Sequence, residues 1–251
     1  MENSAIDVML QHRSTRKFTA EKVDDTLLSE ILECGLRASN TGNMQLYSII
    51  ATRSDKIKAK LAPAHFNQPM ITQAPVVLTF CADVNRYNKW CALRNTDPGT
   101  DNLESLTTAI VDTVICAQNV CVAAEEKGLG ICYLGTTTYN PHMIIEALNL
   151  PKGVMPITTV TLGYPDEDPV RQLRLPLEAI THNDTYCDYS DANINAYYSE
   201  EENDSLNKKF VAENKKQNLA QVFAEVRYTR QASEAFGKIL LETIQKQGFK
   251  L

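Results

Sequence analysis

The stretch AIVDTVICAQNVCVAAEEKGLG, residues 109–130, decides how this chain of 251 residues can fold. Together with the turn that opens at Leu103 it predicts a long helix with almost no charge before Glu125, apart from Glu104 and Asp112. A helix that is apolar on most of its sides has to be buried on most of its sides. In a protein of this size, an interface between subunits is one way to bury it.

Strand-like segments lie on both sides of this helix. PVVLTFCA, residues 75–82, is β-branched and nearly continuously apolar, which is typical of a strand buried on both faces. Further strands are predicted over residues 47–52, 130–136 and 155–164, and further helices over 5–11, 24–38 and 140–150. This alternation predicts an α+β or α/β fold around a mostly buried sheet of four or more strands.

No change in composition marks a boundary between independent domains, so residues 1–251 are expected to form a single domain. Residues 85–102 form a polar excursion within it. Residues 190–251 are expected to be a polar, helix-rich C-terminal extension of the same domain, with an apolar stripe that includes Leu219 and Val222.

The composition excludes several classes of function. With 25 Lys and Arg against 31 Asp and Glu, the chain is acidic, which argues against a non-specific binder of nucleic acid or of anionic membranes. The sequence contains no run of about 18 apolar residues, so no membrane span is expected. The start MENSAIDVML does not resemble a signal peptide. Seven cysteines without a CxxC pair indicate reduced thiols, so a cytoplasmic location is expected.

One short segment reverses the sign of the chain's charge. His12, Arg13, Arg16 and Lys17 surround two hydroxyl residues in HRSTRK. Guanidinium forks, hydroxyls and backbone N–H groups together suit a phosphate. The alternative interpretation of this segment is a solvated basic turn.

Two further polar segments have a functional and a plain interpretation. SNTGN, residues 39–43, with Gln45 behind it, offers amide groups suited to the edge of a planar heterocycle, or it is a simple turn. Arg171 and Arg174 follow a buried strand and could stabilise a reduced flavin or bind a phosphate, or they are two surface arginines.

Other common site patterns are absent from the sequence. No GxGxxG follows the first strand, and there is no GxxxxGK[ST] and no GxSxG. The four histidines are scattered without i, i+4 pairing, so no metal site is expected.

Several segments in order resemble the FMN-dependent nitroreductase family, and in particular its larger, NADPH-preferring branch of nitroreductases and flavin reductases. The matching segments are HRSTRKF at 12–18, ASNTGNMQL at 38–46, YLGT at 133–136, LGYP at 162–165 with RLP at 174–176, HNDTY at 182–186 and KQGF at 246–249. No single segment is specific, but the first five in order are a strong match, and the closing segment also matches. The resemblance implies a three-layer α+β fold, with a central, mostly antiparallel sheet flanked by helices, in an intertwined homodimer that holds two FMN molecules between its subunits.

The resemblance also assigns residues to the cofactor. It implies that the ribityl phosphate is held by His12, Arg13, Ser14 and Arg16, with Arg174 on the same side. From the partner subunit, FMN would be reached by Ser39, Thr41, Asn43 and Gln45. The ring would be contacted by Gln68, and near N5 and the ring face would lie Tyr133, Leu134, Gly135 and Thr136. The branch usually has Lys-Pro-Arg where this chain has Gln172-Leu173-Arg174, which leaves Arg171 to replace the lysine.

The activity implied is that of an NAD(P)H-dependent FMN oxidoreductase. Hydride would pass to FMN N5 and then to a nitroaromatic, quinone or flavin acceptor in a ping-pong cycle, without an obligatory catalytic side chain. The choice of substrate is expected in residues 85–102 and 195–230. The alternatives are another reaction on the same fold, such as dehalogenation or flavin fragmentation, and a flavin-binding protein without turnover.

Overall fold

A computed structural model describes residues 4–251 of the chain, which divide into two compact units. The main unit contains the residues up to Arg171 together with Phe236–Leu251. The helical unit contains Gln172–Ala235.

The main unit is built on an antiparallel sheet with the strand order β1-β2-β4-β3. The strands are β1 (Tyr47–Thr52), β2 (Val76–Asp83), β3 (Gly130–Leu134) and β4 (Val154–Gly163). Every residue of β2 is buried, as the apolar run in the sequence predicts. The predicted four-stranded core is therefore confirmed, with all described strand pairs antiparallel and with β1 and β3 at opposite edges.

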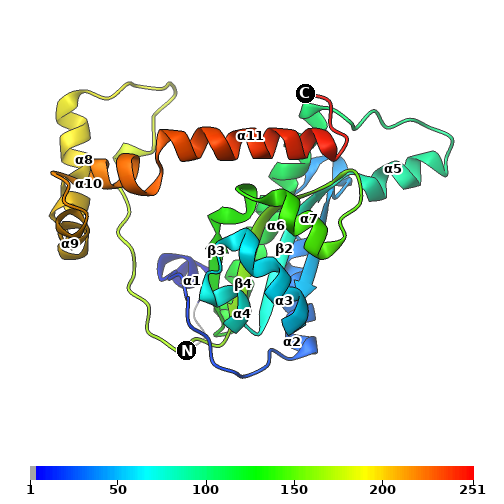
Figure 1. Cartoon of the computed structure of the whole chain (residues 1–251), viewed down its shortest axis with the longest axis horizontal. Coiled ribbons are helices and arrows are strands. Elements are labelled where there is room, and N and C mark those ends of the chain that lie inside the picture. The colour runs from blue at the N-terminus through cyan, green and yellow to red at the C-terminus, as the bar shows by residue number, and fades with distance from the viewer. Residues whose placement is uncertain (1–3) are drawn as a thin grey trace. The chain divides into compact units, whose positions relative to one another are not determined.

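Helices cover both faces of this sheet (Figure 1). Successive strand residues point to opposite faces, so alternate residues of β2 enter two different cores. Val76, Leu78 and Phe80 pack against α2 (Asp25–Leu36) and α6 (Leu103–Glu126). On the other face, the core around Val77 includes side chains of three short helices. Those helices are α3 (Asp55–Leu61), α4 (Pro69–Gln73) and α7 (Pro141–Leu148). The predicted three-layer fold is confirmed.

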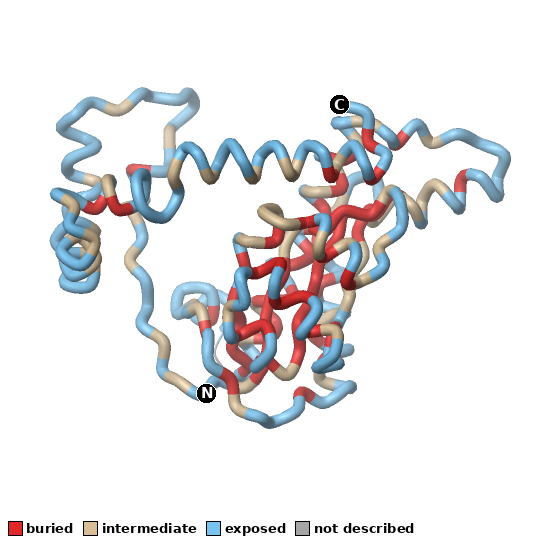
Figure 2. Tube along the Cα trace, viewed as in Figure 1, coloured by how far each residue is buried: buried red, intermediate tan, exposed pale blue. Residues whose placement is uncertain are grey.

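The long helix α6 is the core helix that the sequence predicts. Asn102 caps it by accepting a hydrogen bond from the N–H of Ser105 at 3.0 Å. Small residues such as Ala117 and Ala124 face the sheet and are fully buried. Among residues 4–251, α6 is the one helix long and apolar enough to cross a membrane, but about half of its most apolar stretch is buried in this core (Figure 2).

The uncovered half of α6 carries large apolar residues beside polar ones. Leu103, Val111, Val114 and Ile115 are 58%, 46%, 40% and 37% exposed. The neighbouring helix α1 (Ala5–Leu10) buries Val8 but exposes Ile6, Met9 and Leu10. A contiguous apolar surface of this kind usually marks an interaction site.

The sequence analysis missed some short helices. Residues 85–92, inside the expected polar excursion, form α5 (Asn85–Ala92), while α3 and α4 precede β2. Each is a two-turn helix or shorter, so it contains too few residues for a period of 3.6 to stand out.

The helical unit contains α8 (Asp191–Asn203), α9 (Ser205–Glu213) and α10 (Leu219–Val222). The last helix, α11 (Arg230–Lys246), begins in this unit and ends in the main unit. The expectation that residues 1–251 form one domain, with 190–251 as its extension, stays a prediction.

The contact between α2 and α6 depends on Gly35. A Cβ atom there would lie 2.4 Å from Val120 Cγ2 and 3.2 Å from Cys116 Sγ. We therefore expect Gly35→Ala to lower the free energy of unfolding by about 1–3 kcal/mol, because an extra methyl group forces packed side chains apart. Urea unfolding measures this change.

Gly237→Ala is the matched control. Gly237 lies inside α11, and a Cβ there would have nothing within 4 Å. The control should be neutral or stabilising by up to about 1 kcal/mol, from helix propensity alone. Equal effects of the two substitutions would contradict the tight contact at Gly35.

Candidate functional site

The basic segment lies along the outer edge of β3. Ser14 forms a parallel bridge with Ile131, and the N–H of Thr15 donates to the carbonyl of Ile131 at 2.8 Å. Thr15 packs so closely that a Cβ at Gly130 would lie 2.4 Å from its Oγ1. The first residue of β3 therefore has to be small, and the fold places His12–Arg16 beside the start of this strand.

Three carboxylates hold the segment in place. The contacts are His12 Nδ1 with Glu125 Oε1 at 2.7 Å, Arg13 Nη1 with Asp168 Oδ1 at 2.5 Å, and Glu167 Oε1 with the N–H groups of Arg16 at 2.7 Å and Lys17 at 3.1 Å. Nothing in the sequence pairs these acidic residues with the basic segment. Two of them follow β4 directly, so only the strand pairing brings them to the basic segment.

The side chain of Arg16 remains available to a ligand. Its guanidinium is exposed, and the one hydrogen bond it makes within the described residues is a long one, 3.5 Å, to the carbonyl of Ser14. Because a guanidinium has five N–H donors in a planar fork, most of them are open to an anion.

The end of β3 forms a second part of the candidate site. Gly135 is exposed, and a Cβ there would have nothing within 4 Å. Tyr133 is partly exposed on one side of it, and Thr136 is half-buried on the other. The backbone at Gly135 is thus an open surface against which a planar ring can lie.

The turn before α4 brings Gln68 to this surface. Phe66 and Asn67 both adopt left-handed backbone conformations, with φ of 54° and 55°, and so reverse the chain. Gln68 Nε2 then lies 3.5 Å from Thr136 Oγ1. The structure therefore brings together Gln68 and Thr136, which the sequence analysis assigned to the same ring.

His65 is a residue of this region that the sequence analysis missed. It is fully buried, and its Nδ1 lies 2.8 Å from Thr136 Oγ1. Burial lowers the pKa of His65 from 6.5 to about 4, so the imidazole is neutral at physiological pH. The position of His65 three residues before Gln68 could have directed attention to it, but its neighbours in sequence contain no recognisable pattern.

The amide loop, residues 39–45, is a third part. Thr41 N–H donates to the buried carboxylate of Asp112 at 2.9 Å, and Gln45 Nε2 donates to Asn43 Oδ1 at 3.3 Å. Asn43 and Gln45 have positive φ, and Arg86 donates to the carbonyl of Gln45. Ser39 is exposed at the start of the loop. These hydrogen bonds hold the loop in a defined conformation.

Within a single chain, the amide loop lies far from the basic segment, residues 12–17. The loop leads into β1, which lies at the opposite edge of the sheet from β3. Three strand spacings separate β1 from β3, a distance of about 14 Å. Along α6, Asp112 and Glu125 are thirteen residues apart, or about 20 Å. The predicted residues therefore form two halves on different sides of the unit.

Arg171 is the last residue of the main unit before the chain enters the helical unit, which contains Arg174. Both are exposed, and within the described residues the Arg174 side chain donates only to the carbonyls of Gln172 at 3.4 Å and Leu173 at 3.0 Å. Their assignment to the phosphate side stays a prediction.

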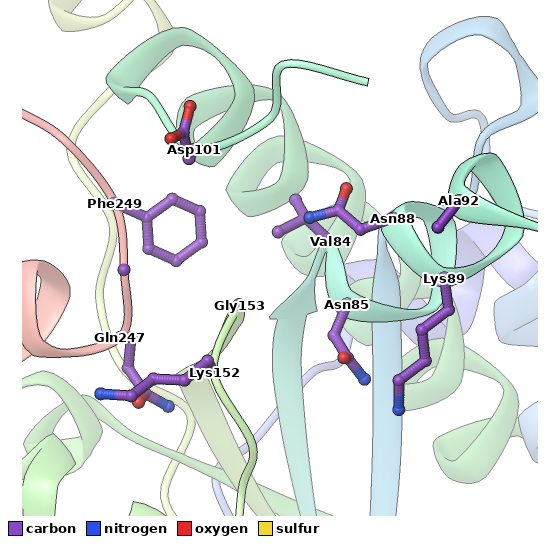
Figure 3. A pocket seen from close by; sticks show the side chains of 11 residues that line it. Val84, Asn85, Asn88, Lys89, Ala92, Asp101, Lys152, Gly153, Gln247 and Phe249 are labelled. Atoms are coloured by element: carbon purple, nitrogen blue, oxygen red, sulfur yellow. The ribbon is translucent and has the colours of Figure 1, made fainter. Parts of the chain in front are cut away.

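A separate hollow of about 390 Å³ contains none of the predicted cofactor-binding residues, but it is lined in part by residues of the 85–102 segment, where the choice of substrate is expected. Figure 3 shows it between Phe249 on one side and Asn85 and Asn88 of α5 on the other. Lys152 and Gln247 lie at its lower edge in this view. Its mixed lining shows no convergence of donors on one point.

The chain is similar to known proteins over most of its length. The family described as "Nitroreductase family" matches residues 9–164. A protein of Bacillus subtilis (strain 168) named FMN reductase (NAD(P)H) is 33% identical over 99% of this chain and 99% of its own length. The oxygen-insensitive NADPH nitroreductase of Salmonella typhimurium is 34% identical over 72% of this chain and 74% of its own.

Solved structures are similar over almost the whole chain. A protein of Bacteroides fragilis NCTC 9343 has a TM-score of 0.96 and 51% identity, covering 98% of this chain and 100% of the other. An NADPH:FMN oxidoreductase from Vibrio harveyi, complexed with NAD⁺, has a TM-score of 0.82 and 28% identity, covering 98% and 99%. This chain belongs to the nitroreductase family.

The buried His65 predicts how stability depends on pH. The unfolded chain binds a proton near pH 6.5, while the folded chain resists it down to about pH 4. Stability is therefore fully present above pH 6.5 and is lost as the pH falls from 6.5 to 4. Between pH 7 and pH 5, the wild type should lose about 2 kcal/mol more than His65→Asn in urea unfolding.

His142→Asn serves as the control, because His142 is an exposed histidine on α7. It should lose as much stability on acidification as the wild type. A His65→Asn variant with the same pH dependence as the wild type would show that His65 does not resist protonation.

Proposed function

We propose that this chain is an FMN-dependent NAD(P)H oxidoreductase of the nitroreductase type that works as a homodimer. The observation that carries the proposal is the open backbone surface at Gly135, on the same edge strand as a cationic segment with an uncommitted arginine. The names of the relatives, which include FMN reductases and nitroreductases, support the same activity. A cytoplasmic location is part of the proposal, supported by seven free cysteines within residues 4–251.

The donor set fits FMN. Arg13, Ser14 and Arg16, with His12 beside them, offer cationic and hydroxyl donors to the phosphate. Gln68 and the backbone of residues 133–136 would hold the ring over Gly135. When bound, FMN supplies the redox chemistry, taking electrons from NAD(P)H and giving them to a nitroaromatic, quinone or flavin.

The protein's own contribution is binding and orientation. Glu167 fixes the backbone of the basic segment, and therefore the direction of the Arg16 side chain, by accepting two N–H groups. The apolar core beneath Leu134 and Ile131 keeps the edge strand rigid. No side chain is assigned a proton-transfer role.

The division of the site supports the proposed homodimer. One chain holds the amide loop at the opposite edge of the sheet from the basic segment, so a second copy has to bring the loop to the same cofactor. The exposed apolar half of α6 offers the surface on which a second copy can pack.

Anaerobic addition of NADPH or NADH to the purified protein tests the activity. We expect yellow protein whose visible absorbance bleaches and then returns when a quinone or a nitroaromatic is added. Colourless protein that takes up no FMN would overturn the proposal, while yellow protein that does not bleach would leave a flavin-binding protein without turnover. Comparison of the two nicotinamides in steady state gives the preferred donor.

Arg16→Ala should weaken FMN retention. The loss of charge-assisted hydrogen bonds to a phosphate should raise the FMN dissociation constant about 10- to 100-fold. The recovery of flavin fluorescence on dilution measures it. Lys22→Ala removes the same charge from an exposed site outside the segment and should retain FMN as the wild type does. Full FMN occupancy in dilute Arg16→Ala would contradict the phosphate assignment.

Val111→Glu should prevent dimerisation. The carboxylate would lie in the middle of the exposed apolar face of α6, where burial against a second copy would cost several kcal/mol. Sedimentation velocity should show a monomer, with FMN lost from the same sample. Leu93→Glu, an equally drastic change at a more exposed residue beyond α5, should stay dimeric and yellow. A dimeric, yellow Val111→Glu variant would place the interface elsewhere.

A further inference from the structure

His65 and Gln68 lie on one tight turn and both reach the hydroxyl of Thr136. His65 ends the short 3-10 helix Ala62–His65, and the two left-handed residues that follow return the chain, so that Gln68 N–H donates to the carbonyl of His65 at 3.1 Å. Left-handed conformations at two successive non-glycine residues are costly. The chain adopts them where they bring both side chains to one oxygen atom.

The protons of this group can be assigned. His65 Nε2 is buried and has no hydrogen-bond partner within residues 4–251. A buried N–H without an acceptor is rarer in proteins than an acceptor without a donor. The single proton of the neutral imidazole therefore belongs on Nδ1, which donates to Thr136 Oγ1 at 2.8 Å.

This assignment sets the direction of the Thr136 hydroxyl. A hydroxyl accepts two hydrogen bonds and donates one. His65 Nδ1 and Gln68 Nε2 supply the two that Thr136 accepts. No acceptor within the described residues takes the proton of Thr136, which lies next to the open surface at Gly135.

We propose that His65 is a positioning residue, which turns the Thr136 hydroxyl so that its proton is presented to the bound cofactor as a hydrogen-bond donor. This inference rests on the proposed function, because the acceptor belongs to the FMN ring. His65 acts through Thr136 and does not itself reach the open surface, since it is fully buried.

The test uses FMN release from the purified holoprotein, followed by flavin fluorescence, and the visible spectrum of the bound flavin. His65→Leu and Thr136→Val should each raise the FMN dissociation constant about 3- to 10-fold, as expected for one hydrogen bond, and should shift the absorbance bands in the same direction. His65→Asn, whose amide N–H can replace Nδ1–H, and Thr136→Ser, which keeps the hydroxyl, should stay within about twofold of the wild type.

The double variant separates positioning from packing. If His65 acts through the hydroxyl, adding His65→Leu to Thr136→Val should change neither FMN release nor the spectrum further. If the two single effects on the FMN dissociation constant multiply in the double variant, the proposal is overturned. A His65→Asn variant that releases FMN as readily as His65→Leu would also overturn it. If His65→Leu fails to fold, Thr136→Val against Thr136→Ser still decides whether the hydroxyl donates.

The two levels of inference fail differently. Wild-type protein that neither contains nor takes up FMN would overturn the proposed function and this inference with it. Wild-type protein that binds FMN with unchanged release and spectrum in Thr136→Val would overturn the positioning role alone.

Discussion

The packing of α6 against the sheet and α2 determines where every part of the candidate site lies. Small residues on its buried side, among them Ala109, Ala117 and Ala124, let the helix approach the sheet closely. Asp112 near the middle of the helix then holds the amide loop, and Glu125 at its C-terminal end holds His12. Because an α-helix rises about 1.5 Å per residue, the thirteen residues between these two carboxylates keep the two halves of the site apart.

This separation has a physical consequence for the whole protein. One sheet cannot bury a helix that is apolar on two sides, and about half of the most apolar stretch of α6 remains exposed. In the proposed homodimer, a second copy would cover this half of α6 and bring its amide loop to the same cofactor, so binding of FMN and assembly would stabilise each other by mass action.

The larger elements were predictable because their signals are long. The strand over 75–82 and the helix from Leu103 appear within one residue or a few residues of their predicted bounds. The two-turn helix α5 was not predicted, since eight residues are too few for a clear period. His65 was not recognised either, because its burial and its contact with Thr136, 71 residues away in the chain, depend on the folded structure.

The sequence by itself determined the layered fold, the family and the residues that carry donors for a phosphate and a planar ring. These depend on local composition and on patterns of apolar residues, which are properties of short segments. Only the tertiary structure decided which of those residues meet. It brought Glu167 to the basic segment and His65 to Thr136, and it kept the amide loop at the far edge of the sheet. Strand order and helix packing, which join distant segments, are the physical reason.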